Sequence, residues 1–263
     1  MSSPPPRVDE IAATGFQRAA GDYERGRPGY PAEVVDRMGL QIGIAAGQTV
    51  VDLAAGTGKL TRRLVELLPA EVIAVEPVAG MRAQLERVLP GVTVLDGTAE
   101  QIPLADGAAH AVFVAQAFHW FRVPEAAAEI ARVLDADGAL AIVRNQEVES
   151  ATAPPVTAAL ALVRERVHHP STRHRTWREE LEQTGVFEPF HEWTVDNNVT
   201  QDIETFRHRI ASRSYIAAMD DDQRALLLDD VQTALERNGI GPGEPFTVPT
   251  VTRVIWARTR RSR

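Results

Sequence analysis

The segment VVDLAAGTGKLT, residues 50–61, constrains the fold of this chain more than any other stretch of its 263 residues. An apolar run reaches an acid at Asp52, the glycines Gly56 and Gly58 follow among small residues, and helical spacing begins near Lys59. An apolar strand, a glycine-containing turn and a helix in this order are typical of nucleotide-binding α/β units. The segment therefore predicts a ligand site at this turn and leaves the identity of the ligand open.

Strands and helices alternate along the chain as far as Asn145. The predicted strands are apolar throughout, rather than at every second residue, which indicates a parallel sheet with helices on both faces. In such sheets, ligands bind outside the carboxyl ends of the strands. The strands are predicted over residues 47–55, 71–77, 92–97, 108–118 and 138–145.

The pattern changes after Asn145. Helices are predicted over residues 153–167, 176–185, 202–211 and 221–236, and strands over 186–195 and 246–259. The last strand contains Pro249, which would suit a sheet edge or a bulge. We therefore predict an α/β, Rossmann-like fold: a doubly wound, mostly parallel seven-stranded sheet with helices on both faces and a helical cap over the ligand cleft. The predicted division is a flexible lead-in (1–14), the Rossmann-like core (15–150), a cap with an added strand (151–245), and the last strand of the sheet with a basic tail (246–263).

Three kinds of glycine loop compete for the turn after the first strand. A phosphate-binding P-loop needs a glycine where Leu53 stands and a Ser or Thr where Leu60 stands, so it fails at two positions. A dinucleotide fingerprint, GxGxxG, has Thr61 in place of its third glycine, which weakens it. Glu76 closes the next strand, where a carboxylate can accept hydrogen bonds from ribose hydroxyls. This carboxylate would serve a nicotinamide cofactor and an adenosyl sulfonium equally well.

The third kind is a site for S-adenosylmethionine. VDLAAGTG resembles motif I of the class I S-adenosylmethionine-dependent methyltransferases, an acid followed by x-G-x-G-x-G, with Ala54 where the first glycine is common. EPVAGM resembles their second motif, and DGTAEQIPLADGAAHAVFVAQAF resembles their third and fourth strands. The cofactor-binding residues that the resemblance implies here are Asp52, Ala54, Gly56, Gly58, Glu76, Pro77, Met81, Thr98, Ala99, Glu100, Gln116 and Phe118.

Two of these positions leave alternatives open. Met81 would pack near the adenine or belong to the core of its helix, since a flexible thioether suits both. Ala54 fits the loop freely if its φ angle is negative. A positive φ would strain an alanine by roughly 1 kcal/mol or more.

Two further stretches, AFHWF (residues 117–121) and YERGRPGYP (residues 23–31), are similar to a small-molecule subset of the family that includes trans-aconitate methyltransferase-like enzymes. The resemblance implies that Arg27 holds the carboxylate of the cofactor and that Tyr23 and Phe118 lie near its sulfonium. A surface arginine and ordinary aromatic packing are the alternatives. His119 could act as a general base, although a histidine bonded to the backbone at a strand end is the plainer interpretation.

These observations predict an S-adenosylmethionine-dependent methyltransferase with a small-molecule acceptor. The methyl group would go to an oxygen, nitrogen or carbon atom, and a carboxylate oxygen is one of the candidates. A nicotinamide-dependent oxidoreductase and a non-catalytic S-adenosylmethionine-binding protein are the alternatives. A net charge of −8 makes nucleic acid and anionic membranes unexpected partners. The chain has no cysteine, so disulfides and thiolate chemistry are excluded, and a cytoplasmic location is expected. The oligomeric state is left open.

No metal site is expected. His168, His169 and His174 lie close together in the sequence, but no cysteine and no ordered carboxylate spacing accompanies them. We therefore expect these histidines to belong to a polar loop between helices.

Two groups of arginines are candidates for charged partners. Arg207, Arg209 and Arg213, in or just after one predicted helix, could hold an acidic substrate, although a solvated helix face is the plainer expectation. Four arginines fall within residues 258–263, where we expect a solvated, frayed tail.

Overall fold

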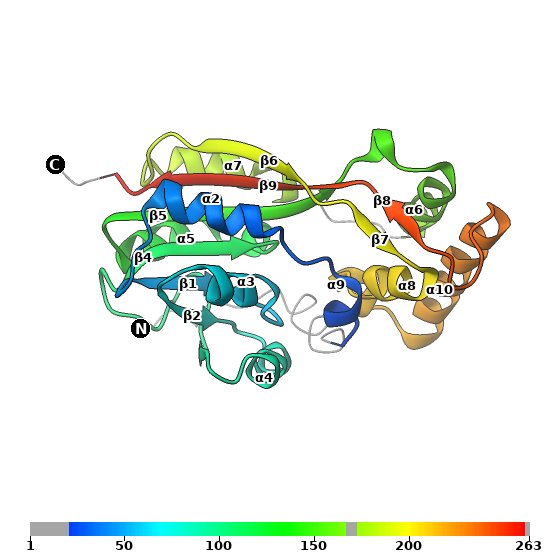
Figure 1. The fold of residues 1–263 in the computed structure, drawn as a ribbon, viewed down its shortest axis with the longest axis horizontal. Coiled ribbons are helices and arrows are strands. Elements are labelled where there is room, and N and C mark those ends of the chain that lie inside the picture. The colour runs from blue at the N-terminus through cyan, green and yellow to red at the C-terminus, as the bar shows by residue number, and fades with distance from the viewer. Residues whose placement is uncertain (1–20, 167–172, 261–263) are drawn as a thin grey trace, which may run out of the picture.

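The structure, a computed structural model, describes residues 21–166 and 173–260, except for the side chains of residues 173–175. Its centre is a seven-stranded sheet with the order β3-β2-β1-β4-β5-β9-β6 (Figure 1). Neighbouring strands are parallel, apart from β9, which is antiparallel to both β5 and β6. This is the mostly parallel, doubly wound α/β sheet that the sequence predicts. The strands are β1 (Thr49–Leu53), β2 (Glu71–Val75), β3 (Thr93–Leu95), β4 (Ala109–Ala115), β5 (Leu134–Glu147), β6 (His191–Asp196) and β9 (Thr250–Arg258).

Both faces of the sheet are buried, which explains why its strands are apolar throughout. Alternate residues of β4 point to opposite faces: Val112 belongs to one hydrophobic cluster and Phe113 to the other. The helices α2 (Ala32–Ile42) and α3 (Lys59–Leu67) contribute to the cluster of Phe113, and α5 (Val123–Val133) contributes to that of Val112. The helix α4 (Ala79–Val88) lies beside β3.

The helix α7 (Arg173–Gln183) corrects an expectation. The sequence predicts that the helix over residues 176–185 helps to cover the ligand cleft. In the structure, Trp177 and Leu181 pack into the hydrophobic cluster of α5, and α7 also contacts the short 3-10 helix η1 (Phe118–Trp120). Two large apolar side chains one turn apart give α7 a buried face, so it becomes a layer of the core.

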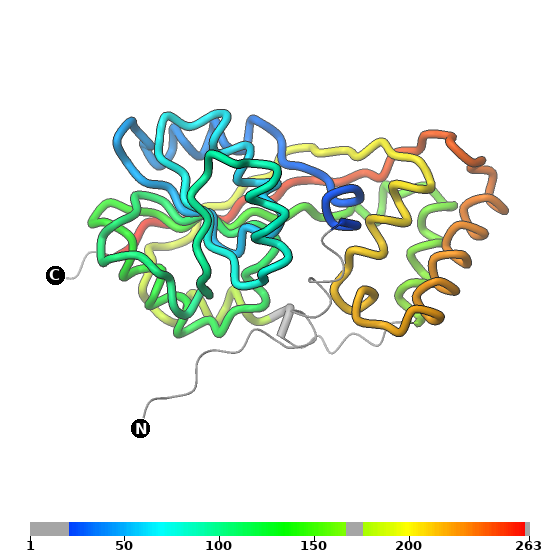
Figure 2. The backbone as a smooth tube through the Cα atoms, turned by 90° about the horizontal axis from the view of Figure 1, so that it is seen from below, coloured from blue at the N-terminus to red at the C-terminus, as the bar shows by residue number. Residues whose placement is uncertain are grey.

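The cap has a hydrophobic cluster of its own. It consists of α6 (Pro154–Arg166), α8 (Ile203–Ala211), α9 (Ser214–Ala217) and α10 (Asp221–Arg237), with a small antiparallel sheet of β7 (Val199–Gln201) and β8 (Phe246–Val248). The 3-10 helix η2 (Glu149–Ala151) leads from β5 towards α6. Figure 2 shows the cap and the sheet at opposite ends of the molecule, with the helical residues 21–26 between them.

Two long strands connect the sheet to the cap. The pairing of β4 with β5 ends at Ala115 and Val143, but β5 continues to Glu147 and stays paired with β9. Pro249 therefore occupies a different place from the one expected. It separates β8 of the cap from β9, and β9 is an interior strand of the large sheet, with neither a bulge nor an edge at the proline.

The basic end of the chain is also more ordered than expected where it is described. The Arg258 guanidinium donates to the carbonyl of Ile42 at 2.8 Å, and Arg260 donates to that of Phe187 at 2.8 Å. These bonds anchor both side chains to the folded chain, so neither belongs to a frayed tail, although Arg260 is exposed to solvent. The remaining arginines of this group, at 261 and 263, lie outside the described residues.

Among the helices within residues 21–166 and 173–260, none combines the length and the apolar character needed to cross a bilayer.

Candidate active site

The loop after β1 turns through three residues with left-handed backbone. The φ angle is 57° at Ala54, 59° at Gly56 and 85° at Gly58. Gly58 is the N-cap residue of α3, and a Cβ atom at this position would lie 3.0 Å from Leu85. The loop thus requires glycine for its conformation and for close packing. Ala54 thus has the positive φ angle rather than the negative one, which strains an alanine by roughly 1 kcal/mol or more.

Glu76 brings a carboxylate to this loop from the end of β2. Leu53 and Val75 are paired across β1 and β2, so the residues that follow them leave the sheet side by side. Oε2 of Glu76 accepts a hydrogen bond from the Gly56 amide at 2.9 Å, and Oε1 accepts one from the Val78 amide at 2.8 Å. Burial raises the pKa of this carboxyl group, and the two amides oppose that shift. The glycine loop and the acid therefore form one unit.

Two buried polar atoms at this edge of the sheet have no hydrogen-bond partner within residues 21–166 and 173–260. Asp52 is fully buried in β1, and its Oδ2 accepts a hydrogen bond from the Thr61 hydroxyl at 2.6 Å. Among the described residues, its Oδ1 has no hydrogen-bond partner, and neither has the buried hydroxyl of Thr98 after β3. Buried polar groups in native proteins are nearly always satisfied. Both atoms therefore fit a polar ligand that would complete their hydrogen bonds.

Several predicted cofactor residues follow β2 and β3 in the chain. Pro77 follows Glu76 directly, and Met81 is 2% exposed in the first turns of α4. After β3, Ala99 is buried, and Glu100 accepts a hydrogen bond from the Arg122 amide at 2.9 Å. The fold thus gathers these residues near Glu76, while their roles towards a cofactor stay predictions.

Two more predicted cofactor residues, Gln116 and Phe118, follow the end of β4. Gln116 has a φ angle of 58°, and its side chain donates to the carbonyl of Asn145 at 2.9 Å. Phe118 is 1% exposed and packs against Phe121 and Trp177, with ring centroids 5.2 and 5.1 Å away. This is the ordinary aromatic packing named above as the alternative for Phe118, and a cofactor contact there stays a prediction.

His119 lies in the same 3-10 helix and is half-buried. Its ring centroid is 5.0 Å from that of Trp120. The histidine thus lies just after the turn that carries Gln116, and its place beside a cofactor stays a prediction. Its role as a general base stays a prediction.

Residues 21–30 run alongside the glycine loop. Glu24, which sequence reasoning missed, accepts a hydrogen bond from the Thr57 hydroxyl at 2.8 Å, and its carbonyl accepts one from Nζ of Lys59 at 2.7 Å. The Arg27 guanidinium lies 5.4 Å from the centroid of the Tyr23 ring. Burial raises the pKa of Tyr23 and lowers that of Arg27. Tyr23 and Arg27 are thus held beside the loop, and Arg27 is partly buried.

The predicted group of Arg207, Arg209 and Arg213 does not form a solvated helix face. Arg209 is 5% exposed and contacts Glu147, as does Arg213. Arg207 differs, because it contacts Asp229 of α10 at 2.9 Å within the cap. Sequence reasoning missed Glu147, since only the extension of β5 beyond β4 brings it to the cap. Among the described residues, no group of three or more potential metal ligands occurs, while His168 and His169 and the side chain of His174 lie outside the description.

Comparisons with known proteins agree with this arrangement. Residues 51–142 match the family described as methyltransferase domain. The chain is 49% identical over 134 residues to an uncharacterized methyltransferase of Mycobacterium tuberculosis, which covers 51% of this chain and 53% of the relative. It is 38% identical over 130 residues to an uncharacterized methyltransferase of Schizosaccharomyces pombe, covering 49% and 52%. The match thus spans about half the length of these curated relatives.

Two solved structures share the fold across most of this chain. A candidate type II methyltransferase from Anaeromyxobacter dehalogenans has a TM-score of 0.63 at 24% identity, covering 89% of this chain and 97% of the other. Phosphoethanolamine N-methyltransferase 2 of Haemonchus contortus, solved with S-adenosylhomocysteine, has a TM-score of 0.52 at 14% identity, covering 94% and 57%. Residues 51–142 are therefore similar to the methyltransferase domain family, and the two solved structures share the fold of this chain.

Proposed function

We propose that the chain transfers a methyl group from S-adenosylmethionine to a small-molecule acceptor. The observation that carries this proposal is the contact between Glu76 and the glycine loop, beside Oδ1 of Asp52, which has no partner in the part of the chain that the structure describes. A carboxylate at the end of the second strand can accept hydrogen bonds from both ribose hydroxyls of an adenosyl group.

The residues at this edge would each hold a different part of the cofactor. Glu76 would bind the ribose, the backbone of residues 54–58 would approach the amino-acid portion, and Met81 with residues 98–100 would flank the adenine. Tyr23 and Arg27 would lie at the carboxylate end. When bound, the cofactor supplies an already activated methyl group. The protein then has to orient the acceptor in line with it and exclude water, which can contribute on the order of 7–11 kcal/mol.

We place this reaction in the cytoplasm, with neither nucleic acid nor a membrane as partner. The net charge of −8 supports this, because phosphate-rich surfaces would repel the chain at long range. His119 would serve as a base only for an acceptor that must lose a proton, and a carboxylate acceptor needs none.

Isothermal titration calorimetry with S-adenosylhomocysteine tests the proposal. We expect binding well below 1 mM, followed by transfer of label from methyl-labelled cofactor to a component of a metabolite extract. If no heat of binding is detected at about 1 mM ligand, the binding free energy is weaker than about −4 kcal/mol. This result would exclude S-adenosylmethionine as the cofactor. If the chain instead enhances NADH fluorescence and does not bind S-adenosylhomocysteine, the oxidoreductase alternative is indicated. Tight binding of S-adenosylhomocysteine without methyl transfer would indicate a non-catalytic protein.

Glu76→Gln provides a sharper test of the same site. A neutral amide keeps one acceptor oxygen but loses the charge-assisted hydrogen bonds, so the dissociation constant for S-adenosylhomocysteine should rise about 10- to 30-fold. The control is Asp96→Asn, since Asp96 lies just beyond β3 and is 69% exposed in its ion pair with Arg82. Equal affinities of the two variants, with both folded, would remove Glu76 from the cofactor site.

A further inference from the structure

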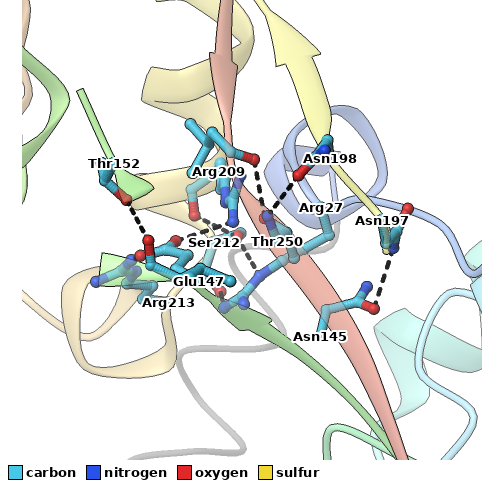
Figure 3. Close-up of polar contacts among 12 residues, drawn as sticks. Arg27, Asn145, Glu147, Thr152, Asn197, Asn198, Arg209, Ser212, Arg213 and Thr250 are labelled. Carbon is cyan, nitrogen blue, oxygen red and sulfur yellow. Dashed lines mark hydrogen bonds and ion pairs between the residues drawn. The ribbon is translucent and has the colours of Figure 1, made fainter. Parts of the chain in front are cut away.

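Two arginines contact one carboxylate where the cap meets the end of β5, and a third arginine lies beside them (Figure 3). We call Arg209, Arg213 and Glu147 the arginine cluster, and Arg27 adjoins it. Oε1 of Glu147 lies 2.9 Å from Nη2 of Arg209 and 3.3 Å from Nη2 of Arg213. Nε of Arg27 donates to the hydroxyl of Ser212, between the other two arginines, at 2.8 Å. The cluster thus holds two positive charges and one negative charge, and Arg27 adds a further positive charge beside it.

The surplus positive charge is buried. The side chain of Arg209 is only 6% exposed, and its Nη1 atom has no hydrogen-bond partner among the described residues. Burial lowers the pKa of Arg209 to about 10, so the guanidinium is still charged at neutral pH. Leaving a charged donor buried and unpaired is costly, and proteins normally avoid it. An anion arriving at this atom would remove that cost.

The cluster lies next to the proposed cofactor site. Arg27 contacts the Tyr23 ring at 5.4 Å, and the charges of Glu76 and Asp52 both act on Tyr23. On the other side, Glu147 ends the same strand whose Asn145 carbonyl binds the Gln116 side chain. A molecule anchored at the cluster would therefore be within reach of the crevice in which the methyl donor would lie.

We propose that the arginine cluster binds an anionic oxygen group, a carboxylate or a phosphate, of the methyl acceptor. This inference rests on the function proposed above and names its substrate class. Guanidinium groups match both anions through paired N–H donors, and Glu147 already occupies two of these donors with a carboxylate. An oxygen held by several guanidinium groups is a weak nucleophile. The cluster therefore anchors the acceptor, and the methylated atom lies elsewhere on the same molecule.

The binding of anions can be measured without knowing the acceptor. We would titrate the full chain with citrate and with inorganic phosphate, in the presence and absence of saturating S-adenosylhomocysteine, and record heats of binding and the midpoint of thermal unfolding. A response to citrate alone would identify a carboxylate, a response to phosphate alone would identify a phosphate, and triethyl citrate serves as the uncharged control. The proposal would be overturned if neither anion produced a response at about 10 mM, ten times a millimolar dissociation constant. An equal response to triethyl citrate would overturn it as well.

Paired variants separate an anion site from a structural ion-pair network. Arg213→Gln should weaken binding of the responding anion about 10- to 100-fold, because it removes a charge-assisted donor. Glu147→Gln should strengthen it about 3- to 10-fold, because the competing carboxylate is lost. Arg207→Gln is the control, from the preceding helix α8, and its anion affinity should equal that of the wild type. If neither Arg213→Gln nor Glu147→Gln changes anion affinity, the cluster is structural and the proposal fails.

The cofactor titration keeps the two proposals apart. Arg213→Gln and Glu147→Gln should each bind S-adenosylhomocysteine within about twofold of the wild type. A tenfold loss of cofactor affinity in Arg213→Gln would mean that the cluster holds the carboxylate of the cofactor, which overturns the inference but supports the proposed function. A wild-type chain that binds anions but no S-adenosylhomocysteine would overturn the proposed function and, with it, the acceptor role of the cluster.

Discussion

The free energy of unfolding should fall by up to about 4 kcal/mol as the pH rises from about 4 to about 7, because of Asp52 alone. Burial raises the pKa of this carboxyl from 3.8 to about 7. Between these values the folded state binds a proton that the unfolded state has released, so stability decreases with increasing pH. The stabilisation is fully present below the unfolded pKa and is lost once the pH exceeds the folded pKa.

Asp52→Asn isolates this contribution from those of the other carboxyl groups. The amide oxygen can still accept from the Thr61 hydroxyl, but the side chain no longer ionises in its buried place. We expect the variant to be more stable than the wild type above pH 7 and similar to it near pH 4, measured by urea unfolding at several pH values. Asp96→Asn, at an exposed carboxylate, should keep the wild-type slope. Parallel curves for Asp52→Asn and the wild type would contradict the prediction.

The sequence predicts the core well because its signals are local. Uniformly apolar strands indicate a sheet covered on both faces. In the sequence, the glycine loop and Glu76 are separated by one helix and one strand. Paired strands then bring Glu76 to Gly56 without help from the rest of the chain. The conformation of Ala54 could not be predicted in this way, since either sign of φ is compatible with its sequence and only the fold decides.

The cap is less predictable because its partners are distant in sequence. Glu147 and Arg209 are separated by 62 residues, and their contact depends on how far β5 extends past β4. The arginine spacing on α8 is the same for a solvated face and for a buried one. Trp177 and Leu181 carry a readable signal, because two large apolar residues one turn apart favour packing on the sheet. The sequence predicts an edge or a bulge at Pro249, and this is wrong, because the proline separates two strands that belong to different sheets.

Gly26→Ala should destabilise the chain by about 3 kcal/mol and lower its cofactor affinity. A Cβ atom at Gly26 would lie 2.1 Å from the backbone nitrogen of Arg209 and 2.3 Å from the carbonyl carbon of His208. Both are backbone atoms of α8 and cannot move away as a side chain could. The helical residues 21–26 would therefore have to separate from the cap, which would break the contact of Asp22 with His208 at 2.7 Å.

The consequence reaches the active site because the same segment also contacts the core. Glu24 contacts the glycine loop, because its carboxylate accepts a hydrogen bond from the Thr57 hydroxyl. If residues 21–26 moved away from α8, they would therefore displace Tyr23 and Arg27 from the crevice. Thermal unfolding and calorimetry with S-adenosylhomocysteine would measure the two effects. Gly29→Ala is the matched control: no atom lies within 4 Å of its added Cβ, so its stability should stay within about 0.5 kcal/mol of the wild type. If Gly26→Ala behaves like Gly29→Ala in both measurements, residues 21–26 neither join the cap to the core nor support cofactor binding.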